Sequence, residues 1–417
     1  MSLMETAGKK QLTDDIKVVA AKERLGEDII LAGVAEGTIA IPKNIKRTLK
    51  NVCGVGKGLK TKVNANIGTS PDHVDVKEEL EKLDYAIKAG ADAVMDLSTG
   101  GDLRSIRKTI LDRCPVALGT VPIYQIVCQA DGIKKIEQEQ IFDVIEEQAE
   151  EGVDFMTVHC GITRETVNVL NRQGRIAGVV SRGGSILAKW ITATNKENPL
   201  YEQYDRLLAI AKKYEVTLSL GDGLRPGCIA DASDGAQIAE LSVLGELVLR
   251  ARKAGVQTMV EGPGHMPLDQ IQPHLNLAKR LIHDAPYYLL GPLVTDVAAG
   301  YDHITSAIGG AIAASYGADF ICYVTPAEHL RLPDKDDVYQ GVMAARIAGH
   351  AGDIVKNVPG AREWDREFSK CRKALDWEKQ QKMAMDPEKF RIERAKLPPQ
   401  ESDVCTMCGK YCAMRDK

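Results

Sequence analysis

Short apolar runs recur along this 417-residue chain between residues 61 and 325, and amphipathic stretches separate each run from the next. Short apolar runs that alternate with helical patterns predict parallel strands in repeated β/α units. Nine runs qualify as strands: 61–67, 91–97, 117–123, 153–159, 176–181, 216–223, 256–262, 287–294 and 319–325. The intervening helices include about 75–89, 138–152, 200–214 and 234–254. Because eight strands close a (β/α)8 barrel, one candidate is either an additional strand or no strand at all.

An open, doubly wound α/β sheet is the main alternative to a barrel. Sheets of that kind commonly carry a glycine-rich dinucleotide fingerprint after their first strand. The nearest match here, GDGLRPG at 221–227, has Pro226 where the fingerprint needs its last glycine. The regular repeat and the missing fingerprint together favour a (β/α)8 TIM-type barrel.

The repeat stops at both ends of the barrel region. Residues 13–35 predict two short amphipathic helices, and residues 36–60 are irregular and rich in glycine and lysine. Beyond the barrel, residues 335–358 and 363–394 predict long helices, with Pro387 interrupting the second, before the linker LPPQESDV. We therefore expect four parts: an N-terminal helical domain at 1–60, the barrel at 61–334, a helical domain at 335–400 and a cysteine-containing tail at 401–417.

The composition argues against nucleic-acid binding, secretion and a membrane span. The net charge is −4 and no basic stripe is present, so nucleic acid is not an expected partner. No apolar run approaches the roughly 18 residues of a membrane helix, and the N-terminus has no signal-peptide core. We expect a cytoplasmic protein, in which clustered cysteines bind metal more often than they form disulfides.

Polar or unusual residues follow almost every predicted strand. In a β/α barrel the carboxyl ends of the strands carry the chemistry. A single residue of this kind is more often a cap or turn residue than a ligand contact, but a convergence of them describes a solvent-facing pocket. The residues at these ends include Asn64, Asn66, Met95, Asp96, Tyr124, His159, Ser181, Arg182, Asp222, Arg225, Glu261, Tyr287 and Tyr288.

The segment SRGGS at 181–185 predicts an anion site. Two glycines allow a ligand to approach the backbone closely, and a helix that follows them offers free N–H groups and the positive end of its dipole. Arg182 adds a positive charge, so phosphate is the expected ligand. The alternative for this segment is an ordinary tight turn between a strand and a helix.

Two histidines close strand-end motifs and are candidate metal ligands: His265 in GPGH and His329 in PAEH. His303 in GYDH is a comparable candidate. Two imidazoles alone do not make a metal site without a third protein ligand or several exogenous ones. Spacing alone therefore favours a structural role for these residues. The remaining candidates for structural histidines are His73, His274, His283 and His350.

Three cysteines, Cys405, Cys408 and Cys412, crowd the end of the chain with the spacing C-x2-C-x3-C. A structural zinc site needs four ligands, and no fourth Cys or His lies nearby. A [4Fe–4S] cluster held by three thiolates leaves one iron open, and that iron can chelate S-adenosylmethionine. The spacing favours the cluster, with a zinc knuckle or no metal as the alternatives.

Nine motifs together carry a resemblance to a known family: NANIGTSP, MDLSTGGDL, GTVPIYQ, SRGGS, SLGDGLRPG, VEGPGHMPL, GYDHITSAIGGA, CYVTPAEHL and CTMCGKYCAM. From about residue 10 to its end, the chain resembles the ThiC family of phosphomethylpyrimidine synthases. The resemblance implies an atypical radical S-adenosylmethionine lyase that rearranges 5-aminoimidazole ribotide to 4-amino-5-hydroxymethyl-2-methylpyrimidine phosphate, the pyrimidine of thiamine. It further implies a [4Fe–4S] cluster, zinc, an electron donor that the sequence does not identify, and a homodimer in which each tail closes over the partner's barrel.

Site residues follow from the resemblance, motif by motif. The implied substrate-binding positions are Asn66, Met95, Tyr124, His159, Ser181, Arg182, Gly183, Asp222, Gly223, Leu224, Arg225, Glu261 and Tyr288. The implied zinc ligands are His265 and His329, and the implied cluster ligands are Cys405, Cys408 and Cys412. The SRGG segment and Arg225 suit the ribotide phosphate, while Asn66, Asp222 and Glu261 suit its hydroxyls or the aminoimidazole.

Three departures from the family pattern bear on the product. The last gap of the cysteine motif is one residue shorter, Ala298 and Ala299 precede GYDH in place of Ala-Pro, and Arg331 replaces the glycine of HLGLP. A paralogue that resembles this family closely, 5-hydroxybenzimidazole synthase, converts the same ribotide to the lower ligand of a cobalamin, and it is the alternative function. A remote alternative is a non-catalytic protein that binds zinc and a ribotide.

Overall fold

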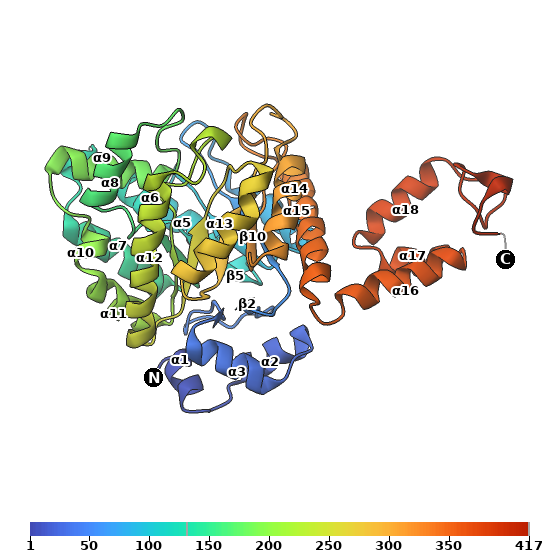
Figure 1. The fold of residues 1–417 in the computed structure, drawn as a ribbon, viewed down its shortest axis with the longest axis horizontal. Helices are drawn as coiled ribbons and strands as arrows, with labels where there is room; N and C mark the ends of the chain where they lie inside the picture. The colour runs from blue at the N-terminus through green and yellow to red at the C-terminus, as the bar shows by residue number, and fades with distance from the viewer. Residues whose placement is uncertain (131, 416–417) are drawn as a thin grey trace. The chain divides into compact units, whose positions relative to one another are not determined.

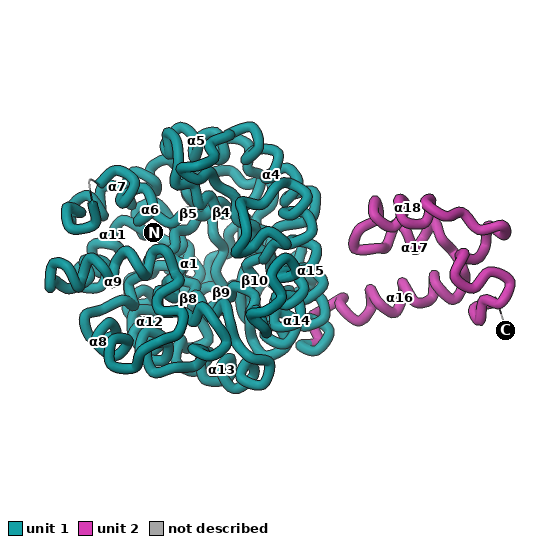
Figure 2. The backbone as a smooth tube through the Cα atoms, turned by 90° about the horizontal axis from the view of Figure 1, so that it is seen from above, with its two compact units in different colours: residues 1–356 teal, residues 357–417 magenta. Residues whose placement is uncertain are grey.

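The computed structural model describes residues 1–130 and 132–415, which form two compact units, 1–356 and 357–417 (Figure 2). The predicted boundary between the barrel and the C-terminal helical domain lies at residue 334. The first unit instead continues to Lys356, because α15 (Lys335–Lys356) packs closely on α14 (Asp302–Ser315) and α4 (Val76–Ala89). The Asp353 carboxylate of α15 accepts a hydrogen bond from the Thr61 amide at 3.0 Å, directly before the first barrel strand.

Eight parallel strands close into a barrel in the order β10-β3-β4-β5-β6-β7-β8-β9, and helices surround them (Figure 1). The strands are β3 (Lys62–Ile67), β4 (Ala93–Asp96), β5 (Ala117–Thr120), β6 (Phe155–Val158), β7 (Thr217–Leu220), β8 (Thr258–Gly262), β9 (Tyr287–Leu290) and β10 (Phe320–Cys322). The predicted (β/α)8 barrel is confirmed. The register pairs Asn66 with Met95 and Glu261 with Tyr288, so these positions lie at matching heights in the barrel.

The ninth predicted strand, 176–181, is wrong. These residues form a loop between α8 (Arg164–Gln173) and α9 (Arg182–Thr194), and β6 pairs directly with β7. The Ile176 side chain is 83% exposed and Gly178 has a φ of +65°, neither of which suits a buried strand. The Asp231 carboxylate accepts hydrogen bonds from the amides of Ile176 and Ala177 and holds the loop in place.

The four helix regions predicted within the barrel are helical, and further helices complete the ring. The helices of the ring are α4, α5 (Leu103–Arg113), α6 (Pro122–Gln129), α7 (Gln138–Glu151), α8, α9, α10 (Pro199–Glu202), α11 (Tyr204–Tyr214), α12 (Gly235–Ala254), α13 (Leu268–Leu281), α14 and α15. Asp75, Asp102 and Asp234 cap α4, α5 and α12, since their carboxylates accept hydrogen bonds from amides of the first turn. Within the described residues, no helix combines the length and apolar character that a membrane crossing requires.

The N-terminal segment packs at the end of the barrel where the strands begin. It contains α1 (Leu3–Gly8), α2 (Asp14–Glu23), α3 (Glu27–Glu36) and the antiparallel pair β1 (Ile39–Ala40) and β2 (Val55–Gly56) (Figure 1). Asp154, directly before β6, is fully buried and forms an ion pair with Arg47. Its carboxylate also accepts a hydrogen bond from the Asn44 amide at 2.9 Å. The N-terminal segment closes this end of the barrel. The carboxyl ends of the strands, at the other end, remain available for a functional site.

The second unit contains three short helices in place of the predicted long one. They are α16 (Ala361–Lys373), α17 (Trp377–Met383) and α18 (Pro387–Lys396). Asp376 and Asp386 cap α17 and α18 by accepting hydrogen bonds from the amides of Lys379 and Lys389, so each aspartate begins a new helix. The tail that follows contains a single turn of 3-10 helix, Gly409–Tyr411.

Candidate active site

A cavity lies at the carboxyl ends of the barrel strands. Asn66, Met95, Glu261 and Tyr288 reach it from β3, β4, β8 and β9. Eight of the thirteen predicted substrate-binding residues line the cavity: Asn66, Met95, Tyr124, His159, Asp222, Arg225, Glu261 and Tyr288. The other lining residues are Leu97, Val121, Thr157, Gly262, Leu289, Leu290 and Cys322.

The predicted anion segment lies beside this cavity. Ser181 caps α9, and its hydroxyl oxygen accepts a hydrogen bond from the Gly184 amide at 3.2 Å and lies 3.3 Å from Nε2 of His159. The Arg182 guanidinium lies 4.8 Å from the centre of the Tyr124 ring. A Cβ atom at Gly183 would lie 2.2 Å from the His159 ring, so only glycine allows this close approach. The N-terminus of α9, the Arg182 charge and His159 therefore gather at one side of the site.

Gly223 and Leu224 shape the loop after β7 and do not line the cavity. The Leu224 side chain is fully buried, and its amide donates a hydrogen bond to Oε2 of Glu240 at 2.7 Å. Gly223 packs so closely on Gly184 that a Cβ there would lie 3.0 Å from the Gly184 Cα atom. The loop therefore holds Asp222 and Arg225 against the segment that begins α9.

Two carboxylates and one guanidinium give the cavity its charge. Asp222 Oδ1 accepts a hydrogen bond from Arg225 Nη1 at 3.1 Å. Glu261 Oε1 accepts hydrogen bonds from the hydroxyls of Thr157 at 2.6 Å and Ser219 at 2.9 Å. Burial raises the pKa of both carboxyl groups above their ordinary values. The nearby acids raise the pKa of Arg225, so this arginine remains charged in the site.

His159 is a neutral imidazole in this environment. Burial, aided by the charge of Arg225, lowers its pKa to about 3. Its Nδ1 atom is buried and has no hydrogen-bond partner among the described residues. A neutral ring with one unpartnered nitrogen at the cavity wall is suited to hydrogen bonding with a bound ligand.

The wall formed by β10, β3 and β9 carries a network that the sequence interpretation missed in part. Asn66 Nδ2 donates a hydrogen bond to the Cys322 sulfur at 3.1 Å, and Asn64 Nδ2 donates one to the Tyr288 hydroxyl at 2.8 Å. The Tyr288 hydroxyl in turn donates to Met95 Sδ at 3.7 Å. Burial raises the pKa of Cys322 to about 11, so the thiol stays protonated.

His265 and His329 come together near this face, with their ring centres 5.4 Å apart. Nδ1 of His265 lies 2.9 Å from Oδ1 of Asp296, and Nδ1 of His329 lies 3.7 Å from Oδ1 of Asp302. Carboxylates at Nδ1 leave Nε2 of each ring for a ligand, which is the usual arrangement behind a metal-bound histidine. The third candidate, His303, lies on α14 next to Asp302. Within the described residues, no group of three or more His, Cys, Asp or Glu side chains is placed to hold a metal ion.

Comparison with known proteins identifies the family of this chain. The family model described as the radical SAM ThiC family matches residues 2–417. The chain belongs to the radical SAM ThiC family. It is 58% identical to a phosphomethylpyrimidine synthase from Moorella thermoacetica, over 100% of this chain and 97% of that protein. It is 56% identical to a phosphomethylpyrimidine synthase from a Thermoanaerobacter species and 55% identical to one from Geobacter metallireducens, with at least 99% of this chain and 96% of those proteins aligned.

Radical SAM membership implies an iron–sulfur cluster and S-adenosylmethionine as cofactors of this ThiC-family chain. Cys405, Cys408 and Cys412 are free thiols, and the amide of Gly409 donates to the Cys405 carbonyl at 3.0 Å. The amide of Cys412 donates to the Gly409 carbonyl at 3.1 Å, so all three thiols lie on one tight turn. A cluster with one open iron requires three thiolate donors, which this turn supplies in number, although their sulfur atoms are not gathered to hold a metal in the described residues.

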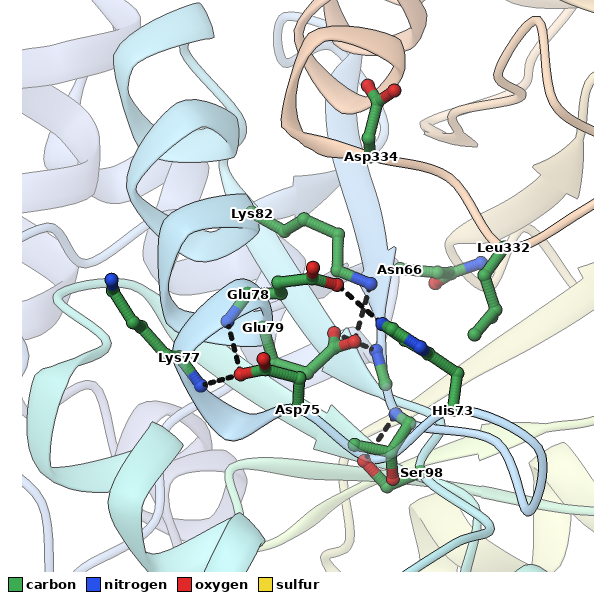
Figure 3. Close-up of polar contacts among 12 residues, drawn as sticks. Asn66, His73, Asp75, Lys77, Glu78, Glu79, Lys82, Ser98, Leu332 and Asp334 are labelled. Atoms are coloured by element: carbon green, nitrogen blue, oxygen red, sulfur yellow. Dashed lines mark hydrogen bonds and ion pairs between the residues drawn. The ribbon is translucent and has the colours of Figure 1, made fainter.

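A second cavity lies at the rim of the ThiC-family barrel, between the segment after β3 and the segment before α15. Its lining residues are Ser70, Asp72, His73, Glu78, Glu81, Lys82, Arg331, Leu332, Pro333, Asp334 and Lys335. Figure 3 shows Lys82 and Glu79 side by side, and His73 beside Glu78. The Lys82 ammonium group lies 2.5 Å from a Glu79 oxygen. Arg331, which departs from the ThiC pattern, forms an ion pair with Asp337 at 2.7 Å.

Several residues of the ThiC-family site were missed from the sequence. Thr157, Ser219 and Cys322 carry polar atoms that contact predicted residues, and all three lie on barrel strands. Strand periodicity offers a signal for Thr157, because it lies two residues before His159 and shares its side of the strand. Glu240 lies on α12, and its contact with the loop after β7 leaves no mark in the sequence.

Proposed function

We propose that this chain is a phosphomethylpyrimidine synthase that rearranges 5-aminoimidazole ribotide to 4-amino-5-hydroxymethyl-2-methylpyrimidine phosphate. The observation that carries the proposal is the cavity at the barrel mouth, where eight residues implied by ThiC-family motifs converge from separate strands and loops. The full-length identity to phosphomethylpyrimidine synthases supports the same activity.

The ribotide phosphate binds at the N-terminus of α9. Free amides of the first turn, the helix dipole and the Arg182 guanidinium supply the positive potential that a phosphate requires. Gly183 allows the phosphate to approach because no side chain fills the space beside His159. Ser181 and Gly183 therefore position the phosphate, and the charged Arg225 gives additional attraction from the loop after β7.

The ribose and the aminoimidazole occupy the rest of the cavity. Asp222 and Glu261 accept hydrogen bonds from ribotide hydroxyls or from the exocyclic amine, and Asn66 offers both a donor and an acceptor. His159, as a neutral ring, hydrogen bonds to the ligand through its unpartnered Nδ1. Met95, Tyr124 and Tyr288 give the cavity its shape and keep water from the bound ribotide, and Gly223 and Leu224 hold the loop that carries Asp222 and Arg225.

Cys405, Cys408 and Cys412 hold the [4Fe–4S] cluster. When bound, a cluster with one open iron would supply a binding position for S-adenosylmethionine and the electron for its reductive cleavage. His265 and His329 hold zinc, with Asp296 and Asp302 fixing the ring orientations and exogenous groups completing the coordination.

The functional form is a cytoplasmic homodimer in which the tail of one protomer closes over the barrel of its partner, and an external donor provides the electron. Co-expression of Cys408→Ala with Asp222→Asn tests this arrangement, because each protein alone lacks one half of every site. If sites are shared in trans, each mixed dimer has one intact site of two, so the randomly paired population should regain about a quarter of wild-type activity and purified mixed dimers about half. Activity at background level in purified mixed dimers would show that each tail serves its own barrel.

Anaerobic reconstitution tests the function itself. Full-length protein loaded with iron and sulfide receives 5-aminoimidazole ribotide, S-adenosylmethionine and dithionite, and the products are separated by liquid chromatography with mass detection. We expect 5′-deoxyadenosine and the hydroxymethylpyrimidine phosphate. Hydroxybenzimidazole as the product would assign the chain to the paralogue, and a colourless protein with zinc at its tail and no cleavage of S-adenosylmethionine would make it a non-catalytic binding protein.

A further inference from the structure

A small cavity lies behind one wall of the active site, between the barrel and its outer helices. Asp222, Glu261 and Gly262 line both this cavity and the active-site cavity, so they form the wall that separates the two. The remaining lining residues come from α12, α13, β9 and the end of β8: Gln237, Glu240, Leu241, Leu244, Pro263, His274 and Tyr287. Its volume is about 10 Å³, which is the scale of a single water molecule.

Three buried side chains around this cavity each have one polar atom without a hydrogen-bond partner. The atoms are Oε1 of Glu240, Oδ2 of Asp222 and Nδ1 of His274. The other polar atom of each is satisfied: Glu240 Oε2 by the Leu224 amide, Asp222 Oδ1 by Arg225, and His274 Nε2 by the Tyr287 hydroxyl at 3.0 Å. An unsatisfied polar atom in a protein interior is destabilising. Three of them around a water-sized cavity are the partners that a buried water molecule needs.

Burial favours the neutral form of Glu240, although the nearby charges of Arg175 and Arg225 oppose it. The titratable and charged groups that face it are Asp222 and Arg225 from the loop after β7, Arg175 from the loop before α9, Glu261 from β8, His274 from α13 and Tyr287 from β9. Arg225 is hydrogen bonded to Asp222, and Arg175 is committed to Asp234 at 2.6 Å. Glu240 thus has no cation of its own, and burial raises its pKa to about 8.

We propose that this cavity holds one ordered water molecule, and that Glu240 stores a proton which this water passes to Asp222 at the wall of the active site. The inference rests on the proposed function, because Asp222 is placed there against the ribotide. Glu240 does not reach the active-site cavity itself, so it is a positioning and proton-storing residue that acts through Asp222.

The transfer balances without a further reactant. The O–H bond at Oε1 of Glu240 breaks, and that proton bonds to the water oxygen. The water releases one of its own protons to Oδ2 of Asp222, and the water is unchanged. Glu240 becomes a carboxylate that still accepts the Leu224 amide, Asp222 becomes a carboxylic acid able to protonate the ribotide, and His274 holds the water in place.

The variant Glu240→Gln tests the proton store, with Glu246→Gln, an exposed residue of the same helix, as the matched control. A glutamine keeps the acceptor for Leu224 but has no acidic proton. We expect it to keep its KM for the ribotide and its cleavage of S-adenosylmethionine, while kcat for the pyrimidine product falls by about ten-fold to a hundred-fold. The alkaline limb of the wild-type pH profile near 8 should also disappear. An unchanged kcat and pH profile in Glu240→Gln would overturn the proposal.

Two measurements test the cavity independently of turnover. Infrared difference spectra of the wild-type protein between pH 6 and 9 should contain the band of a protonated carboxyl group that titrates near pH 8 and is missing in Glu240→Gln. A crystal structure should place one water within hydrogen-bond distance of Glu240, Asp222 and His274. A Glu240 carboxylate ionised at pH 7, or an empty cavity, would overturn the inference, whereas failure of ribotide turnover in the wild-type protein would count against the proposed function alone.

Discussion

The two compact units of this chain differ in how much of their structure is made by a buried core. The barrel unit buries long apolar side chains on its strands, including Phe155, Leu218 and Ile321, which are 0–1% exposed. Among the described residues of the second unit, only Val358, Ala361, Gln380 and Val404 are buried. The buried core of the barrel unit therefore fixes the residues that line its cavity. The second unit depends on helix caps and surface contacts for its structure.

This difference matches the two parts of the chemistry. Binding a ribotide requires fixed side chains, and these lie on strands and on loops that strands hold in place. Holding a cluster requires only that three thiols can meet, because metal–ligand bonds themselves contribute folding free energy. A unit with little core can thus become ordered when its cluster binds, whereas the barrel cannot gain its geometry in this way.

The largest expected effect is a change in the second unit that abolishes cleavage of S-adenosylmethionine and leaves the barrel unchanged. Cys408→Ala should abolish cleavage of S-adenosylmethionine, since two thiolates do not hold the cluster, while thermal unfolding of the barrel and binding of the ribotide remain unchanged. Cleavage is measured as 5′-deoxyadenosine released, and unfolding by circular dichroism. Cys371→Ala, a free cysteine on α16 of the same unit, is the control and should keep its cluster. A barrel that unfolds at lower temperature in Cys408→Ala would contradict the independence of the two units.

Truncation of a buried side chain in the barrel should destabilise the barrel, whereas truncation of a side chain in the second unit should not. Phe155→Ala removes a fully buried ring whose centre lies 6.5 Å from that of Phe320, and it should lower the free energy of unfolding of the barrel by about 3–5 kcal/mol. Trp377→Ala in α17 removes a ring that covers Arg394 at 3.5 Å and donates a hydrogen bond to the Asp403 carbonyl. In Trp377→Ala the free energy of unfolding of the barrel should equal that of the wild-type protein. It is measured by hydrogen exchange of barrel amides at increasing denaturant. Equal losses in both variants would mean that the units unfold together.

A pH-dependent effect of intermediate size belongs to the barrel alone. The folded pKa of Glu240 is about 8 against an ordinary value of 4.5, so the folded protein binds more protons than the unfolded chain between these pH values. The free energy of unfolding therefore falls as pH rises through this window, by up to about 1.4 kcal/mol per pH unit for one group. Asp222 and Glu261 are shifted in the same direction, so the contribution of Glu240 is the difference between the wild-type protein and Glu240→Gln. Parallel pH profiles for these two proteins would show that Glu240 does not titrate in this range.

The barrel could be predicted from the sequence because its strands are short, apolar and separated by amphipathic helices, a pattern that survives without any knowledge of contacts. Its one wrong strand, 176–181, is as apolar as the others, and only the direct pairing of β6 with β7 shows that no place exists for it. The site residues followed from strand ends and from family motifs. Glu240 and His274 gave no signal, because they reach the wall of the site from outer helices.

The second unit was harder to predict for a physical reason. Residues 363–394 have a helical composition throughout, and the sequence marks a break only at Pro387. The break before α17 depends on Leu375, whose φ is +54°, and on the capping by Asp376, which composition does not distinguish from a surface aspartate. In a unit with so little core, local capping decides where helices end. Apolar periodicity therefore does not predict these helix ends.

The smallest expected effect concerns the tail. Arg415 forms ion pairs with Glu401 and with Asp403, the latter at 2.6 Å, and so closes the segment that carries the three cysteines. The two carboxylates are exposed and Arg415 is partly exposed, so their attraction is weak and is screened by salt. Arg415→Gln should accelerate proteolytic cleavage of the cluster-free tail at low salt, and the difference from the wild-type protein should vanish at about 1 M salt. Once the cluster is bound, both proteins should resist cleavage equally, because the thiolate–iron bonds then hold the turn. A difference that persists at high salt, or that persists with the cluster bound, would mean that Arg415 has a role beyond closing this segment.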